Sequence, residues 1–329
     1  MADRESAFES DRAVSAGRSA EAGARQVTRS DPSSESLPRA LLPDRDPAVE
    51  RDRVRSFLAE RVDAAAADGV VVNMSGGLDS TVTAALAVEA LGPERVYGLI
   101  LPCNKVGAPH ARDAEALAAA LGIEHDTVHL QPLFAQFGAV VPDRFDLHDE
   151  PVRSGNAVAR LRMTVAYLAA NATNRLVCGT ANRSELLLGY LTKHGDGAAD
   201  VFPLGHLYKS GVRALAAELD VPEFVVEKPP TAGFLPGQRD ADDLGAPYEV
   251  VDPVLHLGVD RGLDSESVAE RIAATVAEVD RTADDDGGEG SATAVLAGID
   301  RDLVADLLAR HRATAHKRLP PPTPDGDME

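Results

Sequence analysis

The chain has 329 residues and a formal net charge of -20 at pH 7, with 53 acidic residues against 33 basic ones. This acidity excludes a general nucleic-acid-binding protein, because such proteins present basic surfaces to phosphates. No apolar run approaches the roughly 20 residues that span a bilayer, and the N-terminus lacks the apolar core of a secretory signal. We therefore expect a cytoplasmic protein with neither a membrane nor a nucleic acid as its partner.

Lysine is rare in this sequence, since only five of the 33 basic residues are lysine and the others are arginine. An acidic excess with scarce lysine is typical of a protein kept soluble in high salt, where counterions screen its self-repulsion. We therefore expect the protein to come from a halophile. The two cysteines, Cys103 and Cys178, lie too far apart for a C-x-x-C metal or redox site. We predict that they are buried as small apolar residues.

In chain order, residues 1–45 are polar and lack apolar periodicity, which predicts a mobile extension. From Val54 onward, apolar residues recur at helical spacing as far as Ala65, and this helix leads into a Val-rich strand. The predicted strands are 70–74, 96–101, 125–130 and 175–178, and the helices between them are 111–121 and 154–172, the last with Val158, Leu161, Val165 and Leu168 facing inward. This alternation predicts an α/β fold with a doubly wound parallel sheet, a Rossmann-like three-layer sandwich that binds ligands at the carboxyl ends of its strands.

The remainder of the chain is predicted to be helical, with breaks rich in glycine, acidic residues or proline. Helices are expected at 209–219, 265–279 and 300–315. An acidic, glycine-rich loop is expected at 284–290. Proline ends regular structure near residue 320, so residues 321–329 are predicted to form a disordered tail.

The segment Ser75-Gly76-Gly77-Leu78-Asp79-Ser80 joins the first predicted strand directly to a helix. Its two glycines let the backbone approach a ligand, so that successive N–H groups can converge on phosphate oxygens. Ser75 and Ser80 add hydroxyl donors, and the start of the helix favours negative charge. This pattern predicts a polyphosphate cradle.

The cradle contains Asp79 where a Walker A loop has lysine, and it is not a dinucleotide G-x-G-x-x-G motif. A carboxylate beside phosphates repels them unless a cation lies between, so Asp79 is predicted to be a Mg²⁺ ligand. The alternative is an ordinary Gly-Gly turn with an acidic residue in the first turn of a helix. The complete loop resembles the pyrophosphate loop of the N-type ATP pyrophosphatases, which implies ATP as co-substrate.

A second polar segment, residues 179–210, follows the fourth predicted strand. Thr180 continues the phosphate-facing edge of the sheet, and Glu185 offers a second carboxylate that, with Asp79, can hold Mg²⁺. Taken individually, Glu185, Asp196, Asp200 and Lys209 are more often ordinary residues of a helix, a turn, a strand edge and the surface.

Taken together, these segments resemble the ammonia-dependent NAD synthetases. The markers follow the family's order: the loop 75–80, Gly155 to Met163, 179–200, Lys209, 228–240 with Leu244 to Tyr248, and 316–318. The resemblance covers residues 46–320, which would be the catalytic domain. It implies that the carboxylate of deamido-NAD attacks the α-phosphorus of ATP, and that ammonia then displaces AMP from the acyl adenylate to give NAD.

The resemblance also implies roles for individual residues. Removing a positioned contact to developing charge costs roughly 10²–10³ in rate, so these roles are testable. The implied metal ligands are Asp79 and Glu185, and the implied catalytic residues, which form the ammonia pocket, are Asp196 and Lys209. The implied ATP contacts are Ser75, Gly76, Gly77, Leu78, Asp79, Ser80, Thr180, Lys209 and Thr231. The implied deamido-NAD contacts are Arg160, Lys193, Asp200, His316 and Lys317.

The chain departs from the family pattern at Ala241, where many relatives have glutamate, and the segment Leu101 to Asn104 leaves the adenine contacts unassigned. Glutamine-dependent relatives carry a further hydrolase domain, which residues 1–45 are too short and too polar to form. Free ammonia or a separate partner must then supply nitrogen. The resemblance implies a homodimer.

Four alternatives remain open at the level of sequence. The first two are other ATP pyrophosphatases, namely a GMP synthetase core and a tRNA-thiolating enzyme, although the latter usually needs paired cysteines and a basic surface. The third is a non-catalytic adenine-nucleotide sensor, which would have no need of an ammonium pocket. The last is a purely structural α/β domain.

Overall fold

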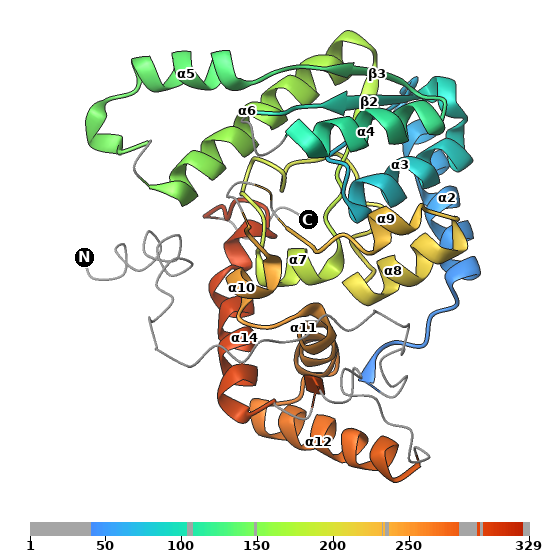
Figure 1. Cartoon of the computed structure of the whole chain (residues 1–329), viewed down its shortest axis with the longest axis vertical. Coiled ribbons are helices and arrows are strands. Elements are labelled where there is room, and N and C mark those ends of the chain that lie inside the picture. The colour runs from blue at the N-terminus through green and yellow to red at the C-terminus, as the bar shows by residue number, and fades with distance from the viewer. Residues whose placement is uncertain are drawn as a thin grey trace. The chain divides into compact units, whose positions relative to one another are not determined.

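A computed structural model describes residues 41–103, 108–147, 150–231, 233, 237–282, 295–296 and 299–324 (Figure 1). The chain divides into two compact units. The sheet unit comprises Arg45–Arg239 and Lys317–Glu329, and the helical unit comprises Met1–Asp44 and Asp240–His316. Most of the predicted extension, the loop 284–290 and residues 325–329 lie outside the described residues, so these expectations stay predictions.

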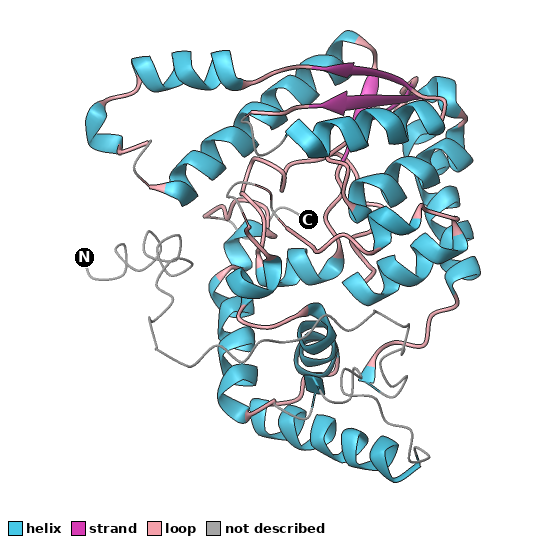
Figure 2. Ribbon diagram, viewed as in Figure 1, coloured by secondary structure: helices cyan, strands magenta, loops and turns pink. Residues whose placement is uncertain are grey.

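The sheet unit is built on four parallel strands in the order β3-β2-β1-β4. Figure 2 shows strands in magenta and helices in cyan. The strands are β1 (Gly69–Asn73), β2 (Val96–Ile100), β3 (Glu124–Thr127) and β4 (Arg175–Cys178). In the observed register, Val72 pairs with Gly98 on one side and with Cys178 on the other. This arrangement confirms the predicted doubly wound sheet. The strand order reverses between β1 and β4, which is where ligands bind in such folds.

Helices cover both faces of the sheet (Figure 1). Successive residues of β1 point to opposite faces, so Val70 and Val72 join one core cluster while Val71 joins another. The first cluster is completed by α2 (Pro47–Ala64), α3 (Leu78–Leu91), α4 (Ala108–Ala120) and α8 (Lys209–Glu218). The second is completed by α5 (Gln131–Val140) and α6 (Pro151–Ala172). The predicted three-layer sandwich is therefore confirmed.

The prediction that Leu168 of α6 faces inward is wrong. Leu168 is 68% exposed, whereas Gly155, Ala159, Ala166 and Ala170 are buried. Small side chains let the helix lie close to the sheet, and their position around the helix turns Leu168 toward solvent. Apolar periodicity detects the large residues of a helix, but here the small residues determine which face packs.

Helix α2 begins earlier than the sequence predicted. Asp46 caps it by accepting a hydrogen bond from the Ala48 N–H at 2.9 Å, and Pro47 occupies the first helical position. Val54, Leu58 and Val62 face the core as expected.

Short elements complete the sheet unit. They are the 3₁₀ turns Pro93–Arg95 and Asp143–Phe145 and the helices α7 (Arg183–Leu188) and α9 (Glu223–Val226). Both cysteines are buried as predicted, and burial raises the pKa of the Cys178 thiol to about 12. Both thiols are therefore unreactive core residues.

A buried ionic cluster joins α2 to the loop that precedes α8. The Glu50 carboxylate binds His206 Nε2 at 2.8 Å and Arg45 Nη1 at 2.9 Å. Burial raises the pKa of Glu50, but the hydrogen bonds from His206 and Arg45 outweigh burial and lower that pKa overall. Glu50 is therefore ionised at neutral pH. The cluster fixes the segment from which the side chain of Lys209 extends.

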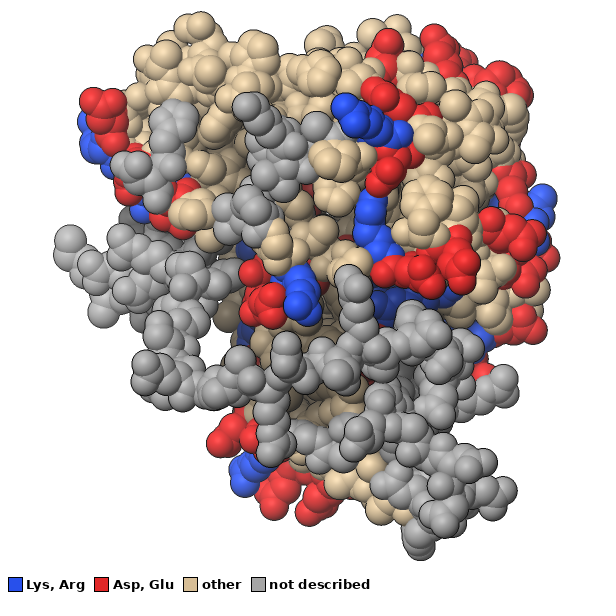
Figure 3. All heavy atoms as spheres, viewed as in Figure 1, with Lys and Arg blue, Asp and Glu red and all other residues tan. Residues whose placement is uncertain are grey.

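The helical unit contains α10 (Asp240–Leu244), α11 (Tyr248–Leu255), a π-helical turn (His256–Asp260), α12 (Ser265–Thr282), α14 (Arg301–Ala313) and the turn Ala315–Lys317, which ends in the sheet unit. α12 and α11 both pack on α14. Within the described residues, no helix has the length and apolar character needed to cross a membrane. Figure 3 shows acidic side chains in clusters on the visible face, with fewer basic ones among them, beside a broad area of other residues.

Candidate functional site

The glycine loop follows β1 at the point where the strand order reverses. Gly76 has φ of +73°, and a Cβ added there would lie 2.5 Å from the backbone oxygen of His110. Both the positive φ and the close approach require glycine. The loop therefore has the backbone conformation that the sequence predicted for a cradle.

The hydroxyl groups of Ser75 and Ser80 organise this loop. The Ser75 N–H donates to Ser80 Oγ at 3.2 Å, and the two hydroxyls lie 3.0 Å apart. The Gly77 N–H donates to Ser75 Oγ at 3.4 Å, a long and weak bond. Helix α3 begins at Leu78, and its N-cap residue, Gly77, has no side chain that could cap it. The loop can therefore exchange weak internal hydrogen bonds for bonds to an anion.

Asp79, in the first turn of α3, binds two donors that come from distant parts of the sequence. Asn182 Nδ2 donates to Asp79 Oδ1 at 2.9 Å, and Lys209 Nζ donates to Asp79 Oδ2 at 2.5 Å. Lys209 Nζ also lies 3.3 Å from Glu185 Oε1. The Lys209 side chain is only 4% exposed, against 18% for Asp79 and 16% for Glu185. The two predicted metal ligands are thus brought together, with the Lys209 ammonium between them.

Helix α7 places Asn182 and Glu185 through a capping box. The Glu185 N–H donates to the Asn182 side chain at 3.1 Å, and the Asn182 N–H donates back to Glu185 Oε2 at 3.2 Å. Asn-x-x-Glu is a sequence signature for this motif. Ser184 Oγ accepts from the Lys209 N–H at 3.0 Å and so ties α7 to the start of α8. Asn182, which sequence reasoning assigned no role, therefore contacts both carboxylate-bearing residues.

The donor set of this cluster suits Mg²⁺. Among the described residues, no group of three or more His, Cys, Asp and Glu side chains could hold a metal ion. Mg²⁺ binds through one or two carboxylates and completes its octahedron with water and substrate phosphates. Asp79 and Glu185 supply that number of carboxylates beside the glycine loop. Both accept hydrogen bonds from a cation, so they are arranged to face positive charge.

A lysine that sequence reasoning overlooked binds the back of the glycine loop. Lys228 Nζ donates to the Gly76 carbonyl at 3.0 Å and to Asp113 Oδ2 at 2.6 Å. Thr231, a predicted ATP contact, follows closely in the chain and accepts the Gly233 N–H at 3.0 Å. Thr180, another predicted contact, is half-buried just after β4.

Asp196, the predicted ammonium ligand, is an exposed residue with one anchored oxygen. Its Oδ1 accepts the Thr192 N–H at 2.9 Å, and Thr192 in turn donates to Asn156 Oδ1 at 2.8 Å. Desolvation by the surrounding protein raises the pKa of the Asp196 carboxyl, and the hydrogen bond from the Thr192 N–H and the positive charge of Arg162 offset this effect only in part. The contacts described above for Lys209 are with Asp79 and Glu185, so the pairing of Asp196 with Lys209 in one pocket stays a prediction.

Four of the predicted dinucleotide contacts, namely Arg160, Lys193, Asp200 and Lys317, lie in the sheet unit and take part in hydrogen bonds with backbone groups. Arg160 Nε donates to the Lys193 carbonyl at 3.3 Å. Asp200 accepts the Val177 N–H at 2.7 Å. Lys317 Nζ donates to the carbonyl oxygens of Gly189 and Leu191, at 3.0 and 3.1 Å.

The side chains of Arg160 and Lys317 therefore both bind backbone carbonyls of the segment that follows α7. His316, the fifth predicted contact, is exposed in the helical unit. Its part in a shared site stays a prediction.

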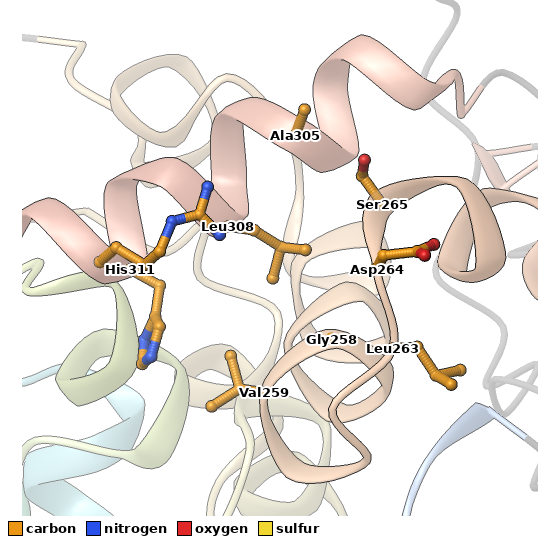
Figure 4. Close-up of a pocket in the computed structure, with 9 residues that line it drawn as sticks. Gly258, Val259, Leu263, Asp264, Ser265, Ala305, Leu308 and His311 are labelled. Atoms are coloured by element: carbon orange, nitrogen blue, oxygen red, sulfur yellow. The ribbon is translucent and has the colours of Figure 1, made fainter.

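The helical unit has a pocket of its own, with a volume of about 440 Å³. Figure 4 shows Asp264 and His311 on opposite sides of it, with Leu308 between them. Its lining comprises Gly258, Val259, Leu263, Asp264, Ser265, Ala305, Leu308, His311 and Arg312. None of these residues belongs to the predicted site.

Comparison with known proteins gives consistent matches. The family described as NAD synthase matches residues 50–284. The NH(3)-dependent NAD(+) synthetase of Halobacterium salinarum is 39% identical over 277 residues, covering 84% of this chain and 93% of the relative. The NH(3)-dependent NAD(+) synthetase of Hyperthermus butylicus is 39% identical over 273 residues, covering 83% of this chain and 88% of the relative.

Solved structures also resemble this one. The NMN synthetase from Francisella tularensis has a TM-score of 0.66 and 34% identity, and the match covers 86% of this chain and 100% of that chain. The NH3-dependent NAD synthetase from Campylobacter jejuni, in complex with the nitrate ion, has a TM-score of 0.61 and 27% identity, with coverage of 85% and 99%.

Proposed function

Because this chain belongs to the NAD synthase family, we propose that it amidates deamido-NAD with ammonia to form NAD, using ATP and releasing AMP and pyrophosphate. The observation that carries this proposal is the pair of carboxylates, Asp79 and Glu185, that share Lys209 beside a glycine loop. A nucleoside triphosphate needs both an N–H cradle and positive charge, and this cluster offers both.

The first step of the proposed reaction joins deamido-NAD to AMP. A carboxylate oxygen of deamido-NAD attacks the α-phosphorus, and the bond from that phosphorus to the pyrophosphate leaving group breaks. Ser75, Ser80 and the N–H groups from Gly76 to Ser80 hold the triphosphate, and Thr180 and Thr231 add hydroxyl donors. Lys209 supplies charge to the phosphates. Mg²⁺, held by Asp79 and Glu185, would neutralise charge that develops on the leaving group.

The second step forms the amide. The nitrogen of ammonia attacks the acyl carbon and loses a proton to solvent, and AMP departs with the electrons of the broken C–O bond. Asp196 has a carboxylate that can bind ammonium, and its raised pKa helps it accept the ammonium proton as ammonia forms. We further propose that Arg160, Lys193, Asp200, His316 and Lys317 bind the dinucleotide.

The decisive experiment is an assay with ATP, Mg²⁺, ammonium and deamido-NAD in which AMP and NAD are measured together. We expect equimolar AMP and NAD, and no turnover without Mg²⁺. AMP formation with xanthosine monophosphate in place of deamido-NAD would favour a GMP synthetase, and nucleotide binding without turnover would favour a sensor. Because one structural relative is named NMN synthetase, nicotinic acid mononucleotide is also tested. Faster turnover of the mononucleotide would reassign the substrate.

The role of Asp196 is tested by Asp196→Asn, which keeps the shape of the side chain and removes its charge. A hydrogen bond to a charged group contributes about 1.5–3 kcal/mol, so amidation should slow by about tenfold or more. Adenylation, followed as pyrophosphate release without ammonium, should change little. Equal losses in both half-reactions would remove the assigned role.

We also propose that the protein is a cytoplasmic homodimer. The family resemblance supports this assembly, and sedimentation at the salt concentration of the assay measures it. A monomer that retains full activity would contradict it.

A further inference from the structure

Lys228 lies at the junction of three segments of the sheet unit. Its Nζ is 3.0 Å from the carbonyl oxygen of Gly76 and 2.6 Å from Asp113 Oδ2, in α4. The Lys228 side chain is 21% exposed, and that of Asp113 is 36% exposed. The ammonium thus binds one backbone carbonyl and one carboxylate in a partly dehydrated position, where such bonds are stronger than in water.

The Gly76 carbonyl determines where the next N–H points. In a trans peptide the C=O and the following N–H point in opposite directions. The structure has no cis peptide bond among its described residues. A bond that fixes the Gly76 carbonyl toward Lys228 therefore directs the Gly77 N–H away from Lys228 and toward Ser75 Oγ, with which it makes the long 3.4 Å contact.

The conformation at Gly76 makes such a restraint necessary. Glycine reaches positive φ readily, but it also reaches many other conformations, so its peptide can rotate. The Gly77 N–H lies at the N-cap of α3, where it can bind an anion. A peptide that rotated freely would lose this donor for part of the time, which would weaken any phosphate bound there.

His110 does not compete with Lys228 for Asp113. Burial, reinforced by the charge of Lys228, lowers the pKa of the His110 ring, so the ring is neutral at physiological pH. Lys228 is then the cation paired with Asp113. That pairing holds the ammonium in place against the Gly76 carbonyl.

We propose that Lys228, anchored by Asp113, is a positioning residue that fixes the Gly76–Gly77 peptide for binding of the nucleotide phosphates. This inference rests on the proposed function, because it concerns the same ATP cradle. Lys228 acts from the carbonyl side of the peptide, opposite the N–H that binds the phosphate. It therefore acts through the loop and does not contact the phosphates itself.

The test compares Lys228→Met, Lys228→Arg and Asp113→Asn in the full-length protein. Lys228→Met should raise the KM for ATP and the dissociation constant of pyrophosphate about tenfold, the scale for losing a group that orients a ligand. The KM for deamido-NAD and for ammonium should stay within about twofold. Lys228→Arg keeps a cationic donor and should recover most of the affinity.

Asp113→Asn distinguishes positioning from direct contact. If Lys228 positions the loop, Asp113→Asn loosens its anchor and should raise the KM for ATP. The double variant Lys228→Met/Asp113→Asn should then have the same KM for ATP as Lys228→Met alone. If Lys228 binds phosphate directly, releasing it from Asp113 should leave or lower that KM. An unchanged or lowered KM for ATP in Asp113→Asn, or an unchanged KM for ATP in Lys228→Met, would overturn the proposal.

Two controls keep the outcomes separate. Arg55→Met removes the ion pairs of Arg55, in α2, with Asp52 and Glu89, and should leave every constant unchanged. The wild-type protein must turn over ATP with deamido-NAD. Failure of that assay would contradict the proposed function, whereas wild-type turnover with an unaffected Lys228→Met would contradict only the positioning role.

Discussion

Lys209→Met is expected to slow adenylate formation by about 10²–10³-fold, the scale for removing a donor aimed at developing charge. Lys209 Nζ contacts the carboxylates of both Asp79 and Glu185. Methionine has nearly the same length and fills the same buried space, so the change removes charge and little volume. Pyrophosphate release with ATP, Mg²⁺ and deamido-NAD measures the effect.

The same substitution should make the stability of the protein depend on Mg²⁺. Removing one partner of a buried ion pair costs up to about 3–5 kcal/mol because the other charge remains, and partial exposure of Asp79 and Glu185 reduces that cost. Added Mg²⁺ should restore part of the lost stability, so the melting temperature of Lys209→Met should rise with Mg²⁺ more than that of the wild type.

Lys209→Arg is the matched control, since it keeps the positive charge in the cluster. Without Mg²⁺, the melting temperature of Lys209→Arg should be close to that of the wild type. The planar guanidinium of arginine cannot, however, place its charge where the lysine ammonium lies. Full activity in Lys209→Met, or an equal response of both proteins to Mg²⁺, would contradict the role assigned to Lys209.

The features that the sequence predicted correctly depend on neighbouring residues. The glycine loop between β1 and α3 could be predicted because a Val-rich strand, two glycines and a helix are contiguous, and Gly76 has the positive φ that this pattern requires. The parallel sheet could be predicted from alternating strands and helices, and four strands do pair in parallel. Local periodicity and turn chemistry suffice for such features.

The contacts that the sequence could not predict join distant segments. Asn182 lies 103 positions from Asp79, and Lys228 lies 152 positions from Gly76. Each residue alone resembles a helix cap or a surface lysine, and nothing in its neighbourhood reveals the partner. The prediction that Leu168 faces inward was wrong for a related reason, because the packed face of a helix depends on how closely the sheet approaches it.

A mutational pair at Asn182 should separate its two bonds. Its side-chain oxygen caps α7, while its side-chain nitrogen donates to Asp79 Oδ1 at 2.9 Å. Asn182→Asp retains a good cap but places a second carboxylate against Asp79. Asn182→Ala loses the cap, at a cost of about 1 kcal/mol, and also loses the donor.

We expect Asn182→Asp to be the less active of the two variants, although its helix cap is intact. Asn182 is fully buried, so the new carboxylate is poorly solvated. Two like charges about 4 Å apart repel each other by roughly 1 kcal/mol in water and roughly 4 kcal/mol near a protein surface. At saturating Mg²⁺, the rate of adenylation in Asn182→Asp should fall by about 100-fold. Thermal unfolding reports the cap independently of the rate. If capping were the whole role of Asn182, Asn182→Asp would match the wild type and only Asn182→Ala would be impaired.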